Sequence, residues 1–198
     1  MSTARPLKVY VIGSLRNPRV PEVAKALREA GFEVFDDWYA AGERADDAWQ
    51  EYEKARGRTY EQALQGHAAK HVFNFDKTHL DASDAAILVG PAGKSGHLEL
   101  GYMIGKGKLG YILIDPVTAD SRWDVMYQFA DRATQELDQI IEDLKTPRVL
   151  ATMVFDDVTV KLKPIPLPQG WHAAAKDLEG EEFGDGQYQF LHNTGMAP

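Results

Sequence analysis

Residues 85–114 read AAILVGPAGKSGHLELGYMIGKGKLGYILI, and this stretch decides the fold class. It begins with an apolar run at residues 85–89 and ends with a second one at residues 111–114. Residues 98–106 are predicted to form a helix between them, so the order is strand, helix, strand. Such a unit implies a parallel sheet, in which ligands bind outside the carboxyl ends of the strands. Glu99 is expected at that edge.

The elements on either side of this stretch extend the same alternation. Gly31 is expected to stop a helix that Pro21 starts. Residues 43–70 are polar and predict one or two solvated helices that cover the site as a flap. The sequence therefore predicts an α/β fold with a doubly wound, flavodoxin-like parallel sheet in the order 2-1-3-4. Its further elements are strands at 7–12 and 32–35 and helices at 74–82, 123–129 and 133–145.

The pattern changes at Pro147, which suggests a catalytic domain at 1–146 and a C-terminal extension at 147–198. Residues 152–163 alternate between apolar and polar side chains around Asp156-Asp157, which predicts a β-hairpin. A tail rich in Gly, Pro and acidic residues follows.

Composition excludes several classes of function. The 198 residues carry a formal net charge of -8, which argues against binding a nucleic acid polymer. There is no cysteine, so disulfides, a thiol nucleophile and thiolate metal sites are excluded. No apolar run approaches the length of a membrane span, and the N-terminus lacks a signal-peptide core. A cytoplasmic protein that does not bind membranes is the default expectation.

The first loop at the carboxyl edge reads Gly13-Ser14-Leu15-Arg16. Glycine allows close backbone approach, Ser14 offers a hydroxyl, and Arg16 offers a planar cation suited to phosphate. The loop matches neither the dinucleotide fingerprint nor a P-loop. It can bind an anion, or it can be a plain solvated turn.

A second group holds Asp76, Asp81 and Asp84 with His79 among them. Asp84 can simply cap the turn before a strand, and Asp76 can be a surface charge on a helix. No compact metal-ligand motif is present, so neither a metal nor an organic cofactor is expected.

Glu99 and Tyr10 form the third candidate group. A Glu in a first helical turn can serve only the helix dipole, and Tyr10 can be a plain core residue. A buried tyrosine hydroxyl usually needs a partner, however, and a nearby carboxylate would supply one. A carboxylate fixed in this way can act as a nucleophile at an electrophilic sugar carbon.

At these residues the chain resembles the nucleoside 2-deoxyribosyltransferases and the related nucleoside 5′-monophosphate N-glycosidases. The resemblance spans about residues 7–145 and rests on three motifs. They are Val9-Tyr10-Val11-Ile12-Gly13-Ser14-Leu15-Arg16, Asn74-Phe75-Asp76 with Asp84 eight residues later, and His97-Leu98-Glu99-Leu100-Gly101-Tyr102.

The resemblance implies a role for each motif. Glu99 would be the nucleophile, Tyr10 would orient it, and Asp76 would recognise the base. Gly13, Ser14 and Arg16 would hold the 5′ end of the substrate. The other positions implied to bind substrate are Asp84, Ser95, His97, Asp124 and Met126.

The implied reaction is cleavage of the N-glycosidic bond of a 2′-deoxynucleoside or its 5′-monophosphate, with transfer to another base or to water. Gly93 departs from the family, which often has Ser or Asp six residues before the nucleophile. Members of the family commonly complete the pocket from a neighbouring subunit, so a homodimer or larger homo-oligomer is expected. Rival readings are an NAD-cleaving or nucleotide-sensing protein, a non-enzymatic nucleotide-binding module and a flavodoxin-like redox protein.

Overall fold

The computed structural model describes residues 5–116, 123–146, 152–155 and 158–161. The chain divides into two compact units, residues 1–144 and residues 145–198. All candidate site residues belong to the first unit.

The first unit is built on a five-stranded sheet in which every strand pairs in parallel with its neighbours. The strand order is β2-β1-β3-β4-β5, as in flavodoxin-like folds. This confirms the predicted fold class and the predicted order of the first four strands. The strands are β1 (Lys8–Ile12), β2 (Glu33–Phe35), β3 (Ala85–Val89), β4 (Leu109–Leu113) and β5 (Arg132–Thr134).

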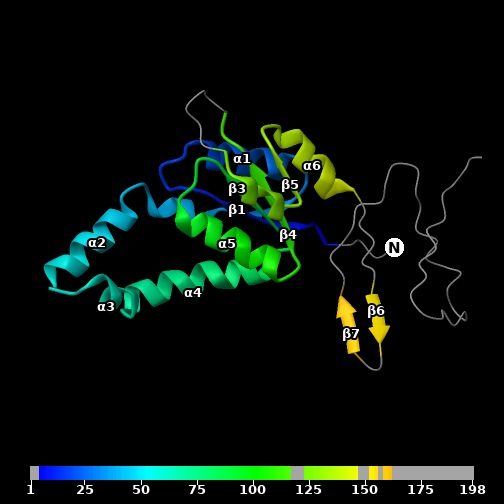
Figure 1. The fold of residues 1–198 in the computed structure, drawn as a ribbon. Coiled ribbons are helices and arrows are strands. Elements are labelled where there is room, and N and C mark those ends of the chain that lie inside the picture. The colour runs from blue at the N-terminus through cyan, green and yellow to red at the C-terminus, as the bar shows by residue number, and fades with distance from the viewer. Residues whose placement is uncertain (1–4, 117–122, 147–151, 156–157, 162–198) are drawn as a thin grey trace, which may run out of the picture. The chain divides into compact units, whose positions relative to one another are not determined.

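Helices cover both faces of this sheet (Figure 1). The helices α1 (Arg19–Glu29) and α6 (Leu137–Lys145) pack on one face, and α4 (His67–Ala82) and α5 (Lys94–Gly105) pack on the other. A hydrophobic core lies on each face of the sheet. Because the side chains of a strand alternate between the faces, β1 contributes to both cores. Val9 and Val11 join the α1 and α6 core, whereas Tyr10 points into the core beneath α4 and α5.

Helix α5 begins at Lys94, four residues earlier than the sequence predicted. Glu99 is therefore in its second turn, where the helix dipole no longer explains a negative charge. Gly96 seats the helix on the sheet, because a Cβ there would lie 2.9 Å from Leu88 Cδ1 and 3.0 Å from Ile12 Cγ2.

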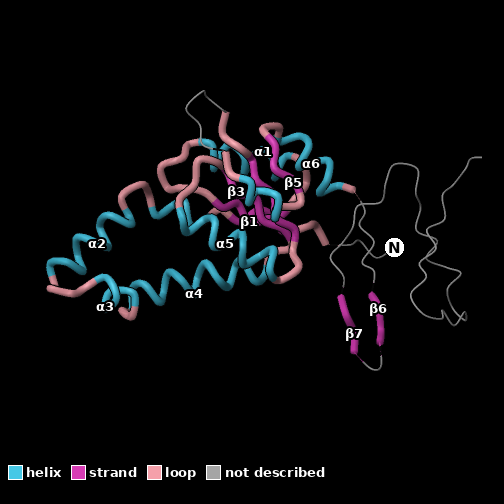
Figure 2. Tube along the Cα trace, viewed as in Figure 1, coloured by secondary structure: helices cyan, strands magenta, loops and turns pink. Residues whose placement is uncertain are grey.

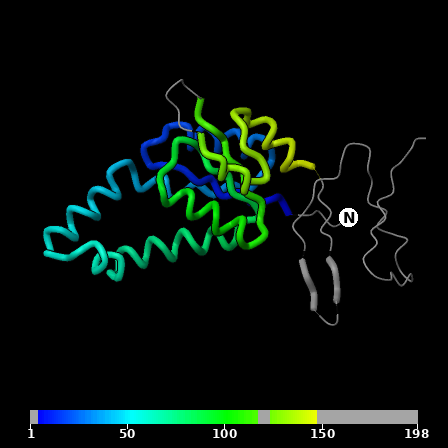
Figure 3. The backbone as a smooth tube through the Cα atoms, viewed as in Figure 1, coloured from blue at the N-terminus to red at the C-terminus, as the bar shows by residue number. Residues whose placement is uncertain are grey.

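A helical arm separates β2 from β3. It follows a 3-10 helix at Asp37–Ala41 (η1) and contains α2 (Ala45–Ala55), α3 (Tyr60–Leu64) and the first half of α4. Helix α3 begins with a capping box in which Thr59 and Gln62 satisfy each other's backbone amides. The arm extends away from the sheet (Figure 3), whereas the sequence predicted helices that cover the site.

The segment after β4 differs from the predicted pair of helices. Where a helix was predicted at residues 123–129, the structure has a 3-10 helix at Val125–Phe129 (η2). Residues 132–134, which overlap the start of the second predicted helix, form β5 at the sheet edge. The predicted helix at 133–145 therefore begins only at Leu137. The edge strand is held by Asp131, whose amide donates to Gly110 O and whose carboxylate accepts from Gly110 N. Three residues are too few to show the alternation that identifies a strand.

The second unit contains two short antiparallel strands, Thr152–Phe155 (β6) and Val158–Lys161 (β7), which form the predicted hairpin (Figure 2). The turn at Asp156-Asp157, the end of the predicted alternation and the acidic tail lie outside the described residues.

Candidate active site

Three titratable side chains meet on the α4 and α5 face of the sheet. Tyr10 comes from β1, Asp76 from α4 and Glu99 from α5. β1 and β3 are neighbours whose crossovers go to opposite sides, and ligands bind at such a switch point in open parallel sheets. The structure therefore brings together the three residues that the sequence named as catalytic.

The Tyr10 hydroxyl anchors this cluster. Its side chain is only 1% exposed. Burial raises the pKa of Tyr10 far above its usual range, and the charges of Glu99 and Asp76 raise it further. The Tyr10 hydroxyl in turn acts to lower the pKa of Asp76. Tyr10 therefore stays protonated beside both carboxyl groups, and the prediction that it orients Glu99 stays a prediction.

The surroundings of Glu99 and Asp76 disfavour the charged form of each carboxyl group. Burial raises the pKa of Glu99 to about 7, and the charge of Asp76 adds to the effect. Burial also raises the pKa of Asp76, although the Tyr10 hydrogen bond and His79 oppose this. Two nearby acids that both resist ionisation can together supply a carboxylate and an acid.

Asp76 retains a free acceptor. Its Oδ1 atom is buried and has no hydrogen-bond partner within the described residues. Buried polar atoms are nearly always paired, so an unpaired one at a sheet edge is suited to a ligand's N–H group.

Aromatic side chains line the same face, and the sequence did not single them out for this role. His79 stacks on Phe35 with ring centroids 3.8 Å apart and planes 10° apart. Phe75 packs edge-on against His79 at 4.7 Å and is 42% exposed. The helical spacing was the available signal, because His79 follows Asp76 by three residues and Phe75 by four, and residues at these spacings are neighbours on a helix.

The loop after β1 lies at the carboxyl edge as expected. The amide of Arg16 donates to Ser14 Oγ at 3.2 Å. Gly13 is required there, because a Cβ would lie 2.5 Å from Val20 Cγ2. The Arg16 guanidinium pairs with Asp47 of α2 at 2.7 Å and remains 60% exposed. A cation suited to phosphate thus has an acidic partner that a phosphate group can replace.

Asp84 does not belong to this site, which corrects its assignment to substrate binding. It precedes β3 and so lies at the amino edge of the sheet. There its carboxylate accepts from Arg5 at 2.7 and 2.8 Å and from the Lys8 amide at 2.8 Å. Burial alone would raise the pKa of Asp84, but these hydrogen bonds bring it below its usual range. Its spacing from Asp76 reflects the length of the helix that crosses from one edge to the other.

Ser95 and His97 lie in the first turns of α5. Ser95 is exposed. The His97 ring contacts Gly93 O through Nδ1 at 2.8 Å and the Tyr127 hydroxyl through Nε2 at 3.4 Å. These contacts aim the ring toward η2, so the structure does not join His97 to the acid cluster.

Asp124 directly precedes η2, and Met126 lies within it. The Asp124 carboxylate caps this helix by accepting from the Met126 amide at 2.9 Å. Met126 is 59% exposed, and Trp123, Val125 and Phe129 beside it are exposed as well. A hollow of about 480 Å³ lies between η2 and the ends of β3 and β4, lined by residues that include Leu88, Pro91, Ile112, Asp115 and Tyr127.

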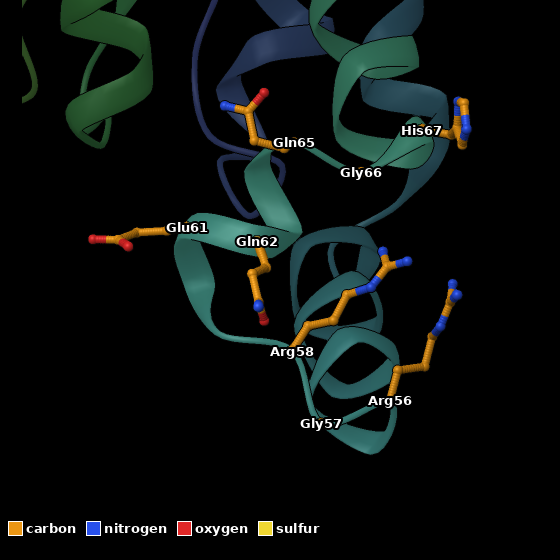
Figure 4. Close-up of a pocket in the computed structure, with 8 residues that line it drawn as sticks. All are labelled: Arg56, Gly57, Arg58, Glu61, Gln62, Gln65, Gly66 and His67. Carbon is orange, nitrogen blue, oxygen red and sulfur yellow. The ribbon is translucent and has the colours of Figure 1, made fainter.

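A second hollow, of about 690 Å³, lies at the tip of the arm (Figure 4). Arg58 is held there by the buried Glu53 at 3.0 Å, and Arg56 donates to the Tyr52 hydroxyl at 3.1 Å. The hollow contains none of the acid cluster, so it does not mark the chemistry. It is lined by Arg56, Gly57, Arg58, Glu61, Gln62, Gln65, Gly66 and His67.

No group of three or more His, Asp or Glu side chains within the described ranges is arranged to hold a metal ion. Across the same ranges, no helix combines the length and apolar character needed to cross a bilayer.

Comparison with protein-family models found no match, and comparison with curated proteins found none either. Among solved structures, one similar chain is a 2-deoxyribosyltransferase from the psychrotolerant bacterium Bacillus psychrosaccharolyticus. The two share 17% identity with a TM-score of 0.45, over 68% of this chain and 90% of that chain. The geometry of the site therefore has to carry the functional proposal.

Proposed function

We propose that the protein cleaves the N-glycosidic bond of a 2′-deoxynucleoside or its 5′-monophosphate and transfers the sugar to another base or to water. The observation that carries the proposal is the half-buried Glu99, whose pKa is raised to about 7 beside Asp76 at the carboxyl edge of the sheet. Such an acid pair suits glycosidic chemistry, in which one group attacks the sugar and the other manages the proton.

In the first step the Glu99 carboxylate attacks C1′ through an oxocarbenium-like transition state. The bond from C1′ to the base nitrogen breaks, and its electron pair leaves with the base. Asp76 gives that nitrogen its proton, so the base departs neutral. The productive form of the pair is thus Glu99 ionised and Asp76 protonated.

In the second step an acceptor attacks C1′ of the glycosyl-Glu99 ester. Asp76, now a carboxylate, takes a proton from the incoming base or water. The ester bond breaks and returns its electron pair to Glu99. Both carboxyl groups regain their starting states, and the two displacements retain the configuration of the sugar.

Tyr10 acts on this cycle through Asp76. Its hydroxyl would steady the acid from one side, while Oδ1 of Asp76 has no hydrogen-bond partner in the described residues. Oδ1 is then available to the departing base. Glu99 is left to be positioned by the packing of α5 on the sheet, which the close approach at Gly96 enforces.

The 5′ end of the substrate is assigned to Ser14, Arg16 and Ser95. Arg16 would exchange Asp47 for a 5′-phosphate, because a doubly charged phosphate is a stronger partner for guanidinium than an exposed carboxylate. Gly93 and Ser95, at the start of α5, would face the same group from the other side.

A homodimer or larger homo-oligomer is part of this proposal. Helix η2 and the residues just before it expose an apolar group that a second copy can cover, made of Trp123, Val125, Met126 and Phe129. Asp124 and Met126 would then contribute to the partner's site. Light scattering and specific activity across a dilution series test this, and a monomer with full activity at nanomolar concentration would refute it.

The function is tested by incubating the protein with a panel of deoxynucleosides and their 5′-monophosphates, with and without a second base, and measuring free and exchanged base by chromatography. The same assay with NAD as substrate, in which nicotinamide release is measured, distinguishes the proposed function from the NAD-cleaving alternative. We expect base release from deoxy substrates that disappears in Glu99→Gln. Base release that is unchanged in that variant would overturn the mechanism, and release only from NAD would favour the alternative.

A further inference from the structure

A buried asparagine joins two loops at the carboxyl edge of the sheet. Asn17 follows the Gly13–Arg16 loop and is only 4% exposed. Its Nδ2 group donates to Gly90 O at 3.0 Å and to Val89 O at 3.2 Å. Both carbonyls belong to the chain that leaves β3 toward α5. The amide thus connects the loop after β1 to the loop after β3.

Every polar group of Asn17 is used in this connection. Its Oδ1 atom accepts from the Arg19 amide at 3.0 Å, which fixes the start of α1. Its own amide donates to Ser14 O at 2.9 Å, and its carbonyl accepts from the Val20 amide at 3.2 Å. Only a side-chain amide can donate two hydrogen bonds and accept a third at this place.

The loop that Asn17 holds leads directly to the nucleophile. Gly90 also donates its amide to Leu113 O at 2.9 Å, so it is fixed against β4 as well. Helix α5 begins four residues later and is seated on Ile12 and Leu88 through Gly96. The position of Glu99 relative to Arg16 therefore depends on rigid contacts that pass through Asn17.

We propose that Asn17 is a positioning residue that fixes the separation between the loop assigned to the 5′ end of the substrate and the helix that carries Glu99. This inference rests on the proposed function. With the separation fixed, binding of a 5′-phosphate at Arg16 places C1′ at attack distance from Glu99, and binding energy at one end of the sugar lowers the barrier at the other. Without the amide, the phosphate still binds but no longer sets that distance.

The informative variant is Asn17→Asp. It keeps the size of the side chain and the oxygen that accepts from Arg19, but it replaces the two donors with an acceptor that faces the carbonyls of Val89 and Gly90. Asn17→Ser is the second variant, because a hydroxyl can restore one donor without a charge. Ile140→Val is the stability control, since it removes one methylene from the opposite core, where Ile140 is fully buried in α6.

The experiment measures kcat and KM separately for a monophosphate and its parent nucleoside, at a temperature where each variant is folded by circular dichroism. We expect Asn17→Asp to lower kcat on the monophosphate by about tenfold or more, with a smaller change in KM and a smaller loss on the nucleoside. Asn17→Ser should recover part of this loss, and Ile140→Val should leave kcat unchanged. A kcat for folded Asn17→Asp equal to that of Ile140→Val, or an equal loss on both substrates, would overturn the proposal.

Hydrogen exchange separates this proposal from the proposed function. The amides of Gly90 and His97 should exchange faster in Asn17→Asp than in Ile140→Val, whatever the reaction is. If the wild-type protein releases no base from any substrate, the proposed function fails while the exchange data still decide whether Asn17 couples the loops. Unchanged exchange at both amides would overturn the coupling even in an active enzyme.

Discussion

Asp84 and Asp81, toward the amino edge of the parallel sheet, have surroundings opposite to those of Glu99 and Asp76 at the carboxyl edge. Toward the amino edge, Asp84 is paired with Arg5, and Asp81 accepts from Lys106, Lys77 and the Tyr102 hydroxyl, which hold its pKa far below the usual range. At the carboxyl edge, Glu99 and Asp76 form no salt bridge with Lys or Arg in the described part of the chain. Their pKa values move in the opposite direction.

This contrast distinguishes acids that stabilise the fold from acids that cost it stability. A paired carboxylate favours its charged form in the native state, whereas a buried unpaired one resists ionisation. A protein retains the second kind where chemistry needs it. The contrast therefore supports placing the reaction at Glu99 and Asp76, and each prediction tests one side of it.

The largest effect is expected for Glu99→Gln. The amide keeps the shape of the side chain but has no nucleophilic carboxylate. We expect turnover to fall by at least about a hundredfold, on the order of 3 kcal/mol in the barrier. Single-turnover base release measures this, with circular dichroism as the check on folding. A folded variant with wild-type rates would remove Glu99 from the chemistry.

The same variant should make the protein more stable at alkaline pH. Because the pKa of Glu99 is raised from 4.5 to about 7, the wild-type protein loses stability as pH rises through this range. Glu99→Gln avoids that loss, so it should match the wild type near pH 4.5 and exceed it at pH 8 by at most about 3 kcal/mol. Urea unfolding at both pH values measures the difference. An advantage that is the same at pH 4.5 and pH 8 would show that ionisation of Glu99 is not its cause.

Tyr10→Phe should reduce the rate less than Glu99→Gln. The substitution removes the hydroxyl that acts on Asp76 but leaves the nucleophile in place. We expect a loss of roughly ten- to a hundredfold, because the acid is then less well oriented toward the base. Single-turnover rates on a deoxynucleoside give the effect. Equality with the wild type would return Tyr10 to the role of a core residue.

Arg16→Ala should affect monophosphates more than nucleosides. A charged hydrogen bond to phosphate contributes about 1.5–3 kcal/mol, so the ratio of kcat/KM between the two substrates should shift by about tenfold or more. Asp47→Asn is the matched control, because it removes the present partner of Arg16 and leaves the guanidinium free for phosphate. Equal losses on both substrates in Arg16→Ala would show that Arg16 does not bind phosphate.

The contrast between the edges also shows how far the sequence could lead. The order of the first four strands followed from the alternation of strands and helices and from right-handed crossovers, and the roles expected of Tyr10, Asp76 and Glu99 followed from motifs that resemble a known family. Three features of the structure could not be predicted from the sequence. β5 is too short for a pattern, the arm's direction depends on how helices pack, and Asn17 gains its role from carbonyls more than seventy residues away in the chain.

Asp84 shows why spacing alone misled. Asp84 is only eight residues from Asp76 in the sequence. Because it stands just before β3, however, it lies at the amino edge of the sheet. Asp76 and Asp84 lie toward opposite edges because the last turns of α4, which ends at Ala82, run from one edge to the other. Topology, which the sequence did predict, was the information needed to exclude Asp84.

The smallest effect is expected for Asp84→Asn, and it tests the paired side of the comparison. Asparagine keeps an oxygen for the Lys8 amide but loses the charge that pairs with Arg5, so the free energy of unfolding should fall by about 1 kcal/mol or less at pH 7. The pKa of Asp84 is lowered in the folded protein, so its contribution is present above the pKa of the unfolded chain and is lost as pH falls. The difference from the wild type should therefore shrink at pH 3, as measured by urea unfolding, while base release stays unchanged. Reduced base release at unaltered stability would instead return Asp84 to the substrate site and contradict the division between the two edges.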